Sequence, residues 1–181
     1  MNNLHTMIER VDKVVSTAVV ALLALLVVDV VWQVLTRFIF EKPSSFTEEV
    51  ARFILIWLSL FGAASAYHRG LHLGIDVLVN KFAGATRFIA EMLVHFAAVL
   101  FSLSILIYGG GKLVALTFSL QQTSAVLGVK MGWIYLAMPL SGLVFLLYSI
   151  GFMFRSIDQY RMNSQPSSDK HQISSDKHKE S

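Results

Sequence analysis

The residues of this sequence that are most capable of chemistry are ionisable side chains within long apolar segments. Asp29, Gln33 and Arg37 are each four positions apart, so a helix would place them along one side. A charge near the centre of a bilayer costs about 3 kcal/mol or more, so such residues pair with one another or serve transport. This group is therefore a candidate for an internal ion pair or for a path that carries protons or ions.

A second polar group follows after a short break. Glu48, Glu49 and Arg52 would occupy the first two turns of the next apolar segment. At a rise of 1.5 Å per residue, Asp29 would lie about 6 Å and Arg52 about 7 Å from the bilayer centre on the same side. We therefore predict an ion pair between Asp29 and Arg52, with Arg37 reaching towards Glu48 or Glu49. The balance of acids and bases favours a structural pair over a proton path, because a paired carboxylate is not free to titrate.

A third polar group combines two later segments. Glu91 and His95 are one helical turn apart, and Tyr148 and Ser149 lie at a similar depth in the last apolar segment. A buried hydrogen-bonded cluster is the first interpretation of this group. Ligation of a haem is the second, and it would draw on further histidines of the chain.

The histidines available for a haem are His68, His72 and His95. A haem between membrane helices needs two facing histidines at one depth, whereas His68 and His72 lie at the membrane edge and His95 lies deeper. The sequence has no cysteine, which excludes disulfides, thiol catalysis and cysteine-ligated metals. We therefore expect no cofactor, no metal site and no catalytic residue.

Four apolar runs must position these residues: Val14–Thr36, Phe46–Tyr67, Phe88–Tyr108 and Gly132–Phe154. Each run is close to the roughly 20 residues that a helix needs to cross a bilayer, and backbone groups in lipid must bond within their own segment. With 55% hydrophobic residues among 181, the sequence predicts an all-α integral membrane protein. Its four transmembrane helices occupy residues 1–154, and the polar tail over 155–181 is expected to be disordered.

The connections carry further signals. Ser45 lies three residues before Glu48, a capping-box spacing that predicts the start of the second helix. The apolar pattern of Leu71–Thr86 favours either a short helix in the membrane interface or an apolar connection packed on the bundle. Gly109–Gly111 should loosen the end of the third span, and Lys112–Leu120 is apolar enough to be helical and to press on a membrane or a partner.

Three features of the spans affect how their helices pack or bend. Gly62 and Ala66 have a small-residue spacing that permits close approach, either within the chain or to a partner helix. Trp57 is a large apolar anchor of the kind that interfaces use. Pro139 removes one backbone hydrogen bond from the fourth run and should kink it.

The basic residues indicate an orientation. In a four-span protein the N-terminal tail, the second connection and the C-terminal tail share one side, and these carry ten of the 15 Lys and Arg residues. The positive-inside rule therefore places both termini in the cytoplasm. The net charge of +3 reports this orientation rather than binding of nucleic acid.

The second apolar run and the residues after it resemble one family. The resemblance is carried by Ser45-Phe-Thr-Glu-Glu-Val-Ala-Arg52, Ile56-Trp57, Gly62-Ala63-Ala64, Arg69-Gly-Leu-His72 and Asp76, in this order. This pattern is similar to the small, DctQ-like membrane subunit of tripartite ATP-independent periplasmic (TRAP) transporters. The length, the four spans and the cytoplasmic termini fit the same family.

The resemblance implies a transport function without enzymatic activity. A large elevator-type membrane subunit would bind an organic acid, a dicarboxylate or an acidic sugar such as sialic acid. A periplasmic binding protein would deliver this substrate, a sodium gradient would drive uptake, and the small subunit would be a scaffold in the bacterial inner membrane. The motif residues then become structural and subunit-contact candidates: Glu48, Glu49, Arg52, Arg69, His72 and Asp76. The outer connection over Lys112–Lys130 would contact the binding protein.

Two other functions remain open at this point. A membrane anchor for a redox enzyme would bind haem or quinone and show a visible Soret band. A small exporter acting as a dimer would use Asp29 or Glu91 as a titrating coupling group. Few polar residues line any pathway through the four runs, which disfavours transport by this chain alone.

Overall fold

The structure is a computed structural model that describes residues 2–40, 45–69 and 85–163. The helices are α1 (Asn2–Phe40), α2 (Ser45–His68), α4 (Ala85–Phe101), the π-helix η1 (Ser102–Gly109), α5 (Gly110–Ser119), α6 (Met131–Tyr135) and α7 (Ala137–Asn163). Four stretches are long and apolar enough to cross a membrane: Thr6–Ile39, Ser45–His68, Met92–Ser119 and Met131–Phe154. The predicted all-α protein with four transmembrane helices is confirmed.

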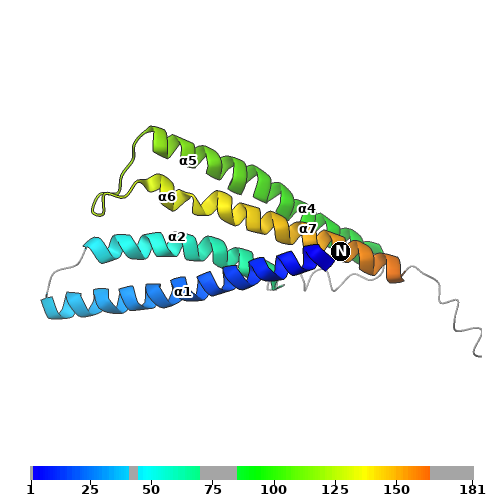
Figure 1. Cartoon of the computed structure of the whole chain (residues 1–181), viewed down its shortest axis with the longest axis horizontal. Coiled ribbons are helices and arrows are strands. Elements are labelled where there is room, and N and C mark those ends of the chain that lie inside the picture. Colours follow the sequence, from blue (N-terminus) through cyan, green and yellow to red (C-terminus); the bar gives the residue numbers. More distant parts are fainter. Residues whose placement is uncertain (1, 41–44, 70–84, 164–181) are drawn as a thin grey trace, which may run out of the picture.

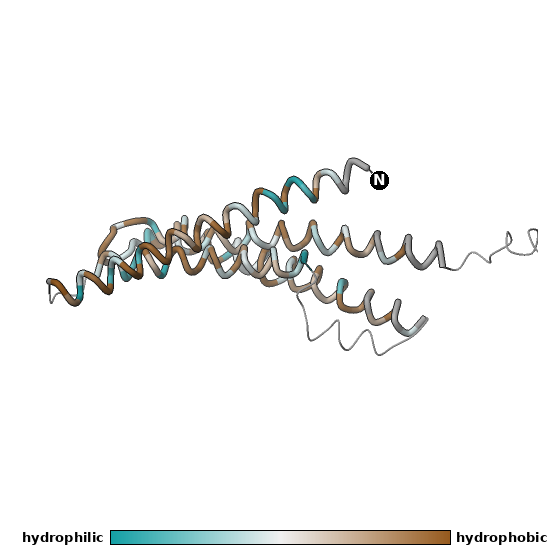
Figure 2. Tube along the Cα trace, turned by 90° about the horizontal axis from the view of Figure 1, so that it is seen from below, coloured by the Kyte–Doolittle hydropathy of each residue, from teal (hydrophilic) through white to brown (hydrophobic). Residues whose placement is uncertain are grey.

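The helices form two antiparallel hairpins (Figure 1). The first hairpin is α1 with α2, and the second pairs the continuous α4–η1–α5 segment with α6 and α7. Contacts of α7 with α2 and with α1 join the two hairpins. In the view of Figure 1 the hairpins converge towards the end where α1 begins, whereas in the view of Figure 2 the helices spread apart at that end.

Few large apolar side chains of the described residues are buried in a core, and many are exposed on the surface of the helices. Val28 is 68% exposed and Phe38 is 80% exposed, although both lie in the first span. Figure 2 shows apolar residues along most of the length of the helices. A surface of this kind is stable in lipid or against another membrane protein, because neither environment penalises exposed apolar groups as water does.

The largest buried side chain lies where the hairpins meet. Tyr148 of α7 is 1% exposed and packs with Tyr67 and Ala64 of α2. Phe145 and Phe152 of α7 pack against the same group. The buried core of the described chain is therefore displaced towards the end of the bundle where α1 begins.

The helix ends agree with the sequence at one point and differ at others. α2 begins at Ser45, as the capping-box spacing predicted. α7 continues to Asn163, nine residues beyond the predicted end of the fourth run at Phe154. The break between α6 and α7 falls at Leu136. Pro139 has no N–H group, so the carbonyl of Tyr135, four residues earlier, has no helical hydrogen-bond donor there. The interfacial helix proposed within residues 71–86 and the tail from 164 onwards fall almost entirely outside the described residues.

The glycines at the end of the third span do not loosen it, so that prediction was wrong. Gly109 and Gly110 both have right-handed helical φ and ψ, and the helix continues through them into α5. A Cβ atom on Gly110 would lie 2.8 Å from Cβ of Met138. The glycine therefore permits close contact with the α6–α7 segment, and this packing outweighs its low helix propensity.

A second glycine contact fixes the same pair of helices. Ser102 at the start of η1 donates a hydrogen bond of 2.5 Å to the carbonyl oxygen of Gly142 in α7. A Cβ atom on Gly142 would lie 2.8 Å from Cβ of Leu106. The third span and α7 thus approach closely along a line of small residues.

Replacement of Gly142 by alanine tests this close approach. We expect Gly142→Ala to lower the free energy of unfolding by about 1–3 kcal/mol, because the new methyl group overlaps Leu106. Thermal unfolding in mild detergent measures the loss. Gly62→Ala is the matched control, since a Cβ there meets nothing within 4 Å among the residues that the structure describes. Equal stability of the two variants would contradict the packing account.

Candidate functional site

Glu49 connects two segments that are far apart in the sequence. Its Oε2 atom accepts hydrogen bonds from the backbone N–H of Leu127 at 2.9 Å and of Val126 at 3.1 Å. Both donors belong to the connection between α5 and α6, in which Ser124 Oγ also lies 3.2 Å from the Leu127 nitrogen. Hydrogen bonds to a carboxylate are stronger than neutral ones. Glu49 therefore holds this connection against the start of α2.

Glu48, one position earlier, makes a different contact. It pairs with Arg52 at 3.3 Å, and the two side chains are 64% and 66% exposed, respectively. The predicted pair between Asp29 and Arg52 is therefore wrong. Glu48 lies one turn before Arg52 on the same helix and reaches it without bridging two helices. Exposed pairs of this spacing contribute about 0.3–0.5 kcal/mol.

The stripe on α1 does not join α2 through ion pairs in the described parts of the chain. Asp29 is half-buried, and its Oδ2 atom is covered without a hydrogen-bond partner there. Gln33 is half-buried and Arg37 is exposed. The expectation that Arg37 pairs with Glu48 or Glu49 was wrong, because Arg52 and the backbone of the connection between α5 and α6 occupy these carboxylates. Matching depth in a membrane does not fix the rotation of two helices about their axes.

Tyr67 is the centre of a polar cluster at the opposite end of α2. Its hydroxyl accepts a hydrogen bond from Ser149 Oγ of α7 at 3.1 Å. The same oxygen lies 2.8 Å from Nδ1 of His95 in α4. Ser149 is fully buried, and the ring of Phe152 stacks on His95 with centroids 5.3 Å apart. One phenol therefore joins three helices from both hairpins.

A neighbouring set of contacts attaches α1 to the same region. Tyr148 donates a long hydrogen bond of 3.4 Å to Oδ1 of Asp12. Arg69 donates to Ser16 Oγ at 2.8 Å, and Ser16 lies 3.5 Å from Ser65 Oγ of α2. The start of α1 is thus bound to the end of α2 and to α7.

The structure brings some of the predicted third group together and adds residues that the sequence did not indicate. His95 and Ser149 share a cluster as expected, but they meet through Tyr67. Tyr148 bonds to Asp12, which lies just outside the first predicted run. The side chain of Glu91 is not among those that the structure describes, and His72 and Asp76 lie outside the described residues.

The remaining candidates have apolar surroundings. Trp57 stacks on Phe61 one turn later in α2, with centroids 5.7 Å apart. A Cβ atom added to Gly62 would meet no other group within 4 Å in the described parts of the chain. His68 stacks on Tyr148 with centroids 4.4 Å apart. Within the described ranges, no group of three or more histidine and carboxylate side chains is placed to hold a metal ion.

The polar contacts at the two ends of the bundle connect helices to one another. Glu49 joins α2 to the connection before α6, and Tyr67 joins α2 to α4 and α7. These arrangements fix the relative positions of helices. The chemistry that they support is structural, and the apolar outer surface is available to lipid or to another membrane protein.

Comparison with known proteins identifies the family. Residues 23–159 match the model of "Tripartite ATP-independent periplasmic transporters, DctQ component". A putative TRAP transporter small permease protein of Haemophilus influenzae is 26% identical over 80% of this chain and 92% of its own length. The sialic acid TRAP transporter small permease protein SiaQ of Vibrio cholerae is 27% identical over 80% of each chain.

A third relative extends the comparison. The C4-dicarboxylate TRAP transporter small permease protein DctQ of Rhodobacter capsulatus is 31% identical over 58% of this chain and 48% of its own length. The family match covers three of the four spans completely and half of the first. Its members are permease components rather than enzymes. This chain therefore belongs to the DctQ family and is a small permease subunit of a TRAP transporter.

Proposed function

We propose that the chain is the fixed scaffold subunit of a TRAP transporter in the bacterial inner membrane. It pairs with a large membrane subunit of the elevator type, which binds the substrate and moves against it. A periplasmic binding protein delivers an organic acid, and a sodium gradient drives uptake. The substrate is a dicarboxylate or an acidic sugar such as sialic acid, in line with the names of the Vibrio and Rhodobacter relatives.

The observation that supports a scaffold most strongly is the polar joint centred on Tyr67. Its hydroxyl connects α2, α4 and α7 at the point where the two hairpins meet. Glu49 supplies a second attachment at the far end of α2. A partner that moves needs a wall that does not move with it, and helices held together at both ends provide such a wall. The exposed apolar faces are then shared between lipid and the large subunit.

Both termini are proposed to be cytoplasmic. The Lys and Arg distribution supports this orientation, because the tails and the second connection together carry most of the basic residues. Tyr67 then lies at the cytoplasmic end of the bundle and Glu49 at the periplasmic end. The structural and subunit-contact role of the motif residues from Glu48 to Asp76 remains part of this proposal.

Reconstitution tests the proposed function directly. Vesicles would contain this chain alone, the large subunit alone, or both, with the binding protein added outside and labelled sialic acid or succinate as substrate. We expect sodium-dependent uptake only when both membrane subunits and the binding protein are present. Transport by this chain alone would instead establish an autonomous transporter and overturn the scaffold proposal.

The outer surface near α5 and α6 is proposed to contact the binding protein. Lys112 and Lys130 are both exposed there, and Lys112 Nζ lies 4.6 Å from the centre of the Tyr108 ring. Reversing both charges, as Lys112→Glu with Lys130→Glu, should slow association with the binding protein about tenfold at low salt. Surface plasmon resonance measures the rate, and Lys13→Glu at the opposite end is the control. Unchanged association of the double variant would remove these lysines from the docking surface.

A further inference from the structure

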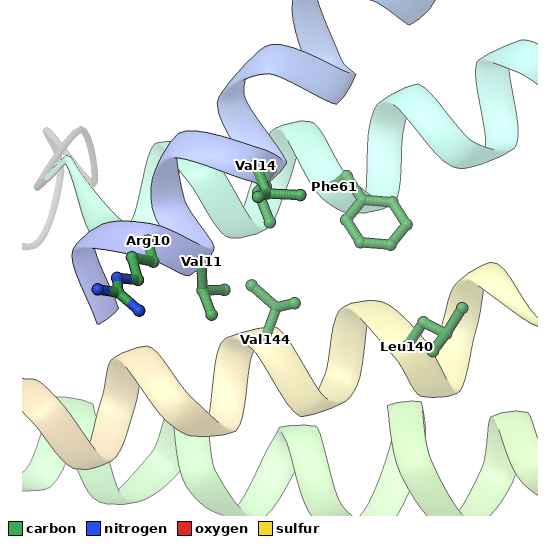
Figure 3. Close-up of a pocket in the computed structure, with 7 residues that line it drawn as sticks. Arg10, Val11, Val14, Phe61, Leu140 and Val144 are labelled. Atoms are coloured by element: carbon green, nitrogen blue, oxygen red, sulfur yellow. The ribbon is translucent and has the colours of Figure 1, made fainter. Parts of the chain in front are cut away.

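A groove opens between the two hairpins on the side of the molecule where α1 begins. Its volume is about 370 Å³. It is lined by residues of α1, α2 and α7, namely Arg10, Val11, Val14, Val15, Phe61, Leu140 and Val144. Arg10 lies at the end nearest the start of α1, and Leu140 lies at the opposite end (Figure 3). Apart from Arg10, every lining side chain is a hydrocarbon.

The level of the groove in the membrane follows from neighbouring contacts. The hydrogen bond between Tyr148 and Asp12 places these two residues at one level. Leu140 is eight residues before Tyr148 and therefore about 12 Å further into the bilayer, while Arg10 is about 3 Å further out. The groove thus extends about 15 Å along the helices, within stretches that are apolar enough to span a membrane.

The groove is too small to enclose a helix of another subunit. A helix with its side chains is at least about 10 Å wide, so 15 Å of helix occupies about 1,200 Å³. This is about three times the volume of the groove. A single hydrocarbon chain is much thinner and matches the aliphatic lining. The dimensions therefore favour an acyl chain as the occupant.

The positive charge of Arg10 at one end of the groove indicates the polar group of the ligand. Arg10 is exposed and, within the described ranges, has no ion pair, while Lys13 is exposed on the next turn of α1. Asp12 nearby already accepts the Tyr148 hydroxyl. A guanidinium binds phosphate oxygens with two parallel hydrogen bonds. A ligand with an acyl chain in the groove and a phosphate beside Arg10 satisfies both ends.

We propose that the groove binds an anionic phospholipid, whose acyl chain fills the space between the hairpins and whose phosphate group contacts Arg10. The lipid would contact both α1 and α7 and so add to the Tyr148–Asp12 hydrogen bond that connects these helices. It would come from the leaflet on the side of the N-terminus. This site does not depend on the transported substrate or on the presence of the large subunit.

Native mass spectrometry of the full-length chain in mild detergent tests the site. Dioleoyl phosphatidylglycerol and dioleoyl phosphatidylcholine are titrated separately, because they share acyl chains and differ in net charge. We expect the anionic lipid to bind more tightly, and Arg10→Gln to weaken its binding about fivefold with little change for the zwitterionic lipid. Arg37→Gln is the control, since this exposed arginine lies at the opposite end of α1.

A second variant tests the groove itself. Val144→Trp should fill the space and reduce the binding of both lipids, whereas Leu143→Trp alters the adjacent, 53% exposed position and should leave binding unchanged. Unaltered binding of phosphatidylglycerol in Arg10→Gln would overturn the proposal. Normal lipid binding by Val144→Trp would also overturn it. If the large subunit were then lost when this variant is purified from native membranes, the groove would belong to a protein partner. Because lipid binding is measured on the isolated chain, these results are independent of the transport assay.

Discussion

Replacement of Tyr67 by phenylalanine is expected to destabilise the chain by about 2–3 kcal/mol. The hydroxyl contacts Ser149 Oγ at 3.1 Å and His95 Nδ1 at 2.8 Å, and Ser149 is fully buried. Its removal takes the acceptor from the buried Ser149 hydroxyl and breaks the contact with His95 Nδ1, and an unsatisfied buried group costs about 1–3 kcal/mol. The ring and its aromatic contacts are retained in Tyr67→Phe. Thermal unfolding in mild detergent, followed by circular dichroism, measures the difference.

The control for this experiment is Tyr108→Phe. Tyr108 is 63% exposed, and its ring would still face Lys112 after loss of the hydroxyl. We expect its stability to stay within about 0.5 kcal/mol of the parent chain. If Tyr67→Phe were as stable as Tyr108→Phe, the phenol could not be the joint between the hairpins.

Replacement of Glu49 by alanine should release the connection between α5 and α6 from α2. The carboxylate accepts the backbone N–H groups of Val126 and Leu127, and alanine offers them no acceptor. We expect the amides of these two residues to exchange with deuterium roughly tenfold faster, while the helices remain protected. Hydrogen–deuterium exchange with mass spectrometry resolves this segment from its neighbours.

Glu48→Ala provides the matched comparison. Glu48 is adjacent in sequence and carries the same charge, but it contacts only the exposed Arg52 side chain among the described interactions. We therefore expect unchanged exchange at Val126 and Leu127. Faster exchange in both variants would show that net charge at the start of α2, rather than the hydrogen bonds of Glu49, holds the connection.

The four spans could be predicted because a membrane helix leaves a strong local signal. The predicted runs Phe46–Tyr67 and Gly132–Phe154 agree with the spans Ser45–His68 and Met131–Phe154 to within one residue at each end. Each backbone in lipid must satisfy its own hydrogen bonds, so apolar length is nearly sufficient to define such a helix. The start of α2 at Ser45 also follows from a local capping signal.

The glycine segment shows where local reasoning is insufficient. Glycine lowers helix propensity, and the sequence therefore predicted a loosened helix at Gly109–Gly111. The structure continues the helix through Gly109 and Gly110 because Met138 and Pro139 pack against Gly110. A single sequence does not state which helix will face a given glycine. Tertiary packing decided this position.

The contacts between helices were the least predictable part of the site. Asp29 and Arg52 match in depth, but depth does not determine which face of each helix meets the other, and Glu48 is the nearer partner. Tyr67 ends an apolar run, where a tyrosine is often a membrane-interface residue, so its role as a joint was not apparent. The hydrogen bond that the Leu127 N–H donates to Glu49 joins residues 78 positions apart, and no local pattern indicates such a pairing.

Membership in the DctQ family gives these contacts a functional context. The family match covers residues 23–159, whereas the contacts of Asp12 and Ser16 involve the part of α1 before it. The structure therefore shows contacts of the start of α1 with α2 and α7 that lie partly outside the segment matched by the family model.

We propose above that this chain is a scaffold for a second membrane subunit. Affinity purification of the tagged full-length chain from its native membrane in mild detergent, followed by quantitative mass spectrometry, tests it most directly. The scaffold account predicts one large membrane protein with many spans, recovered in a one-to-one ratio with this chain. Recovery of the chain alone, or together with a soluble redox enzyme, would contradict it.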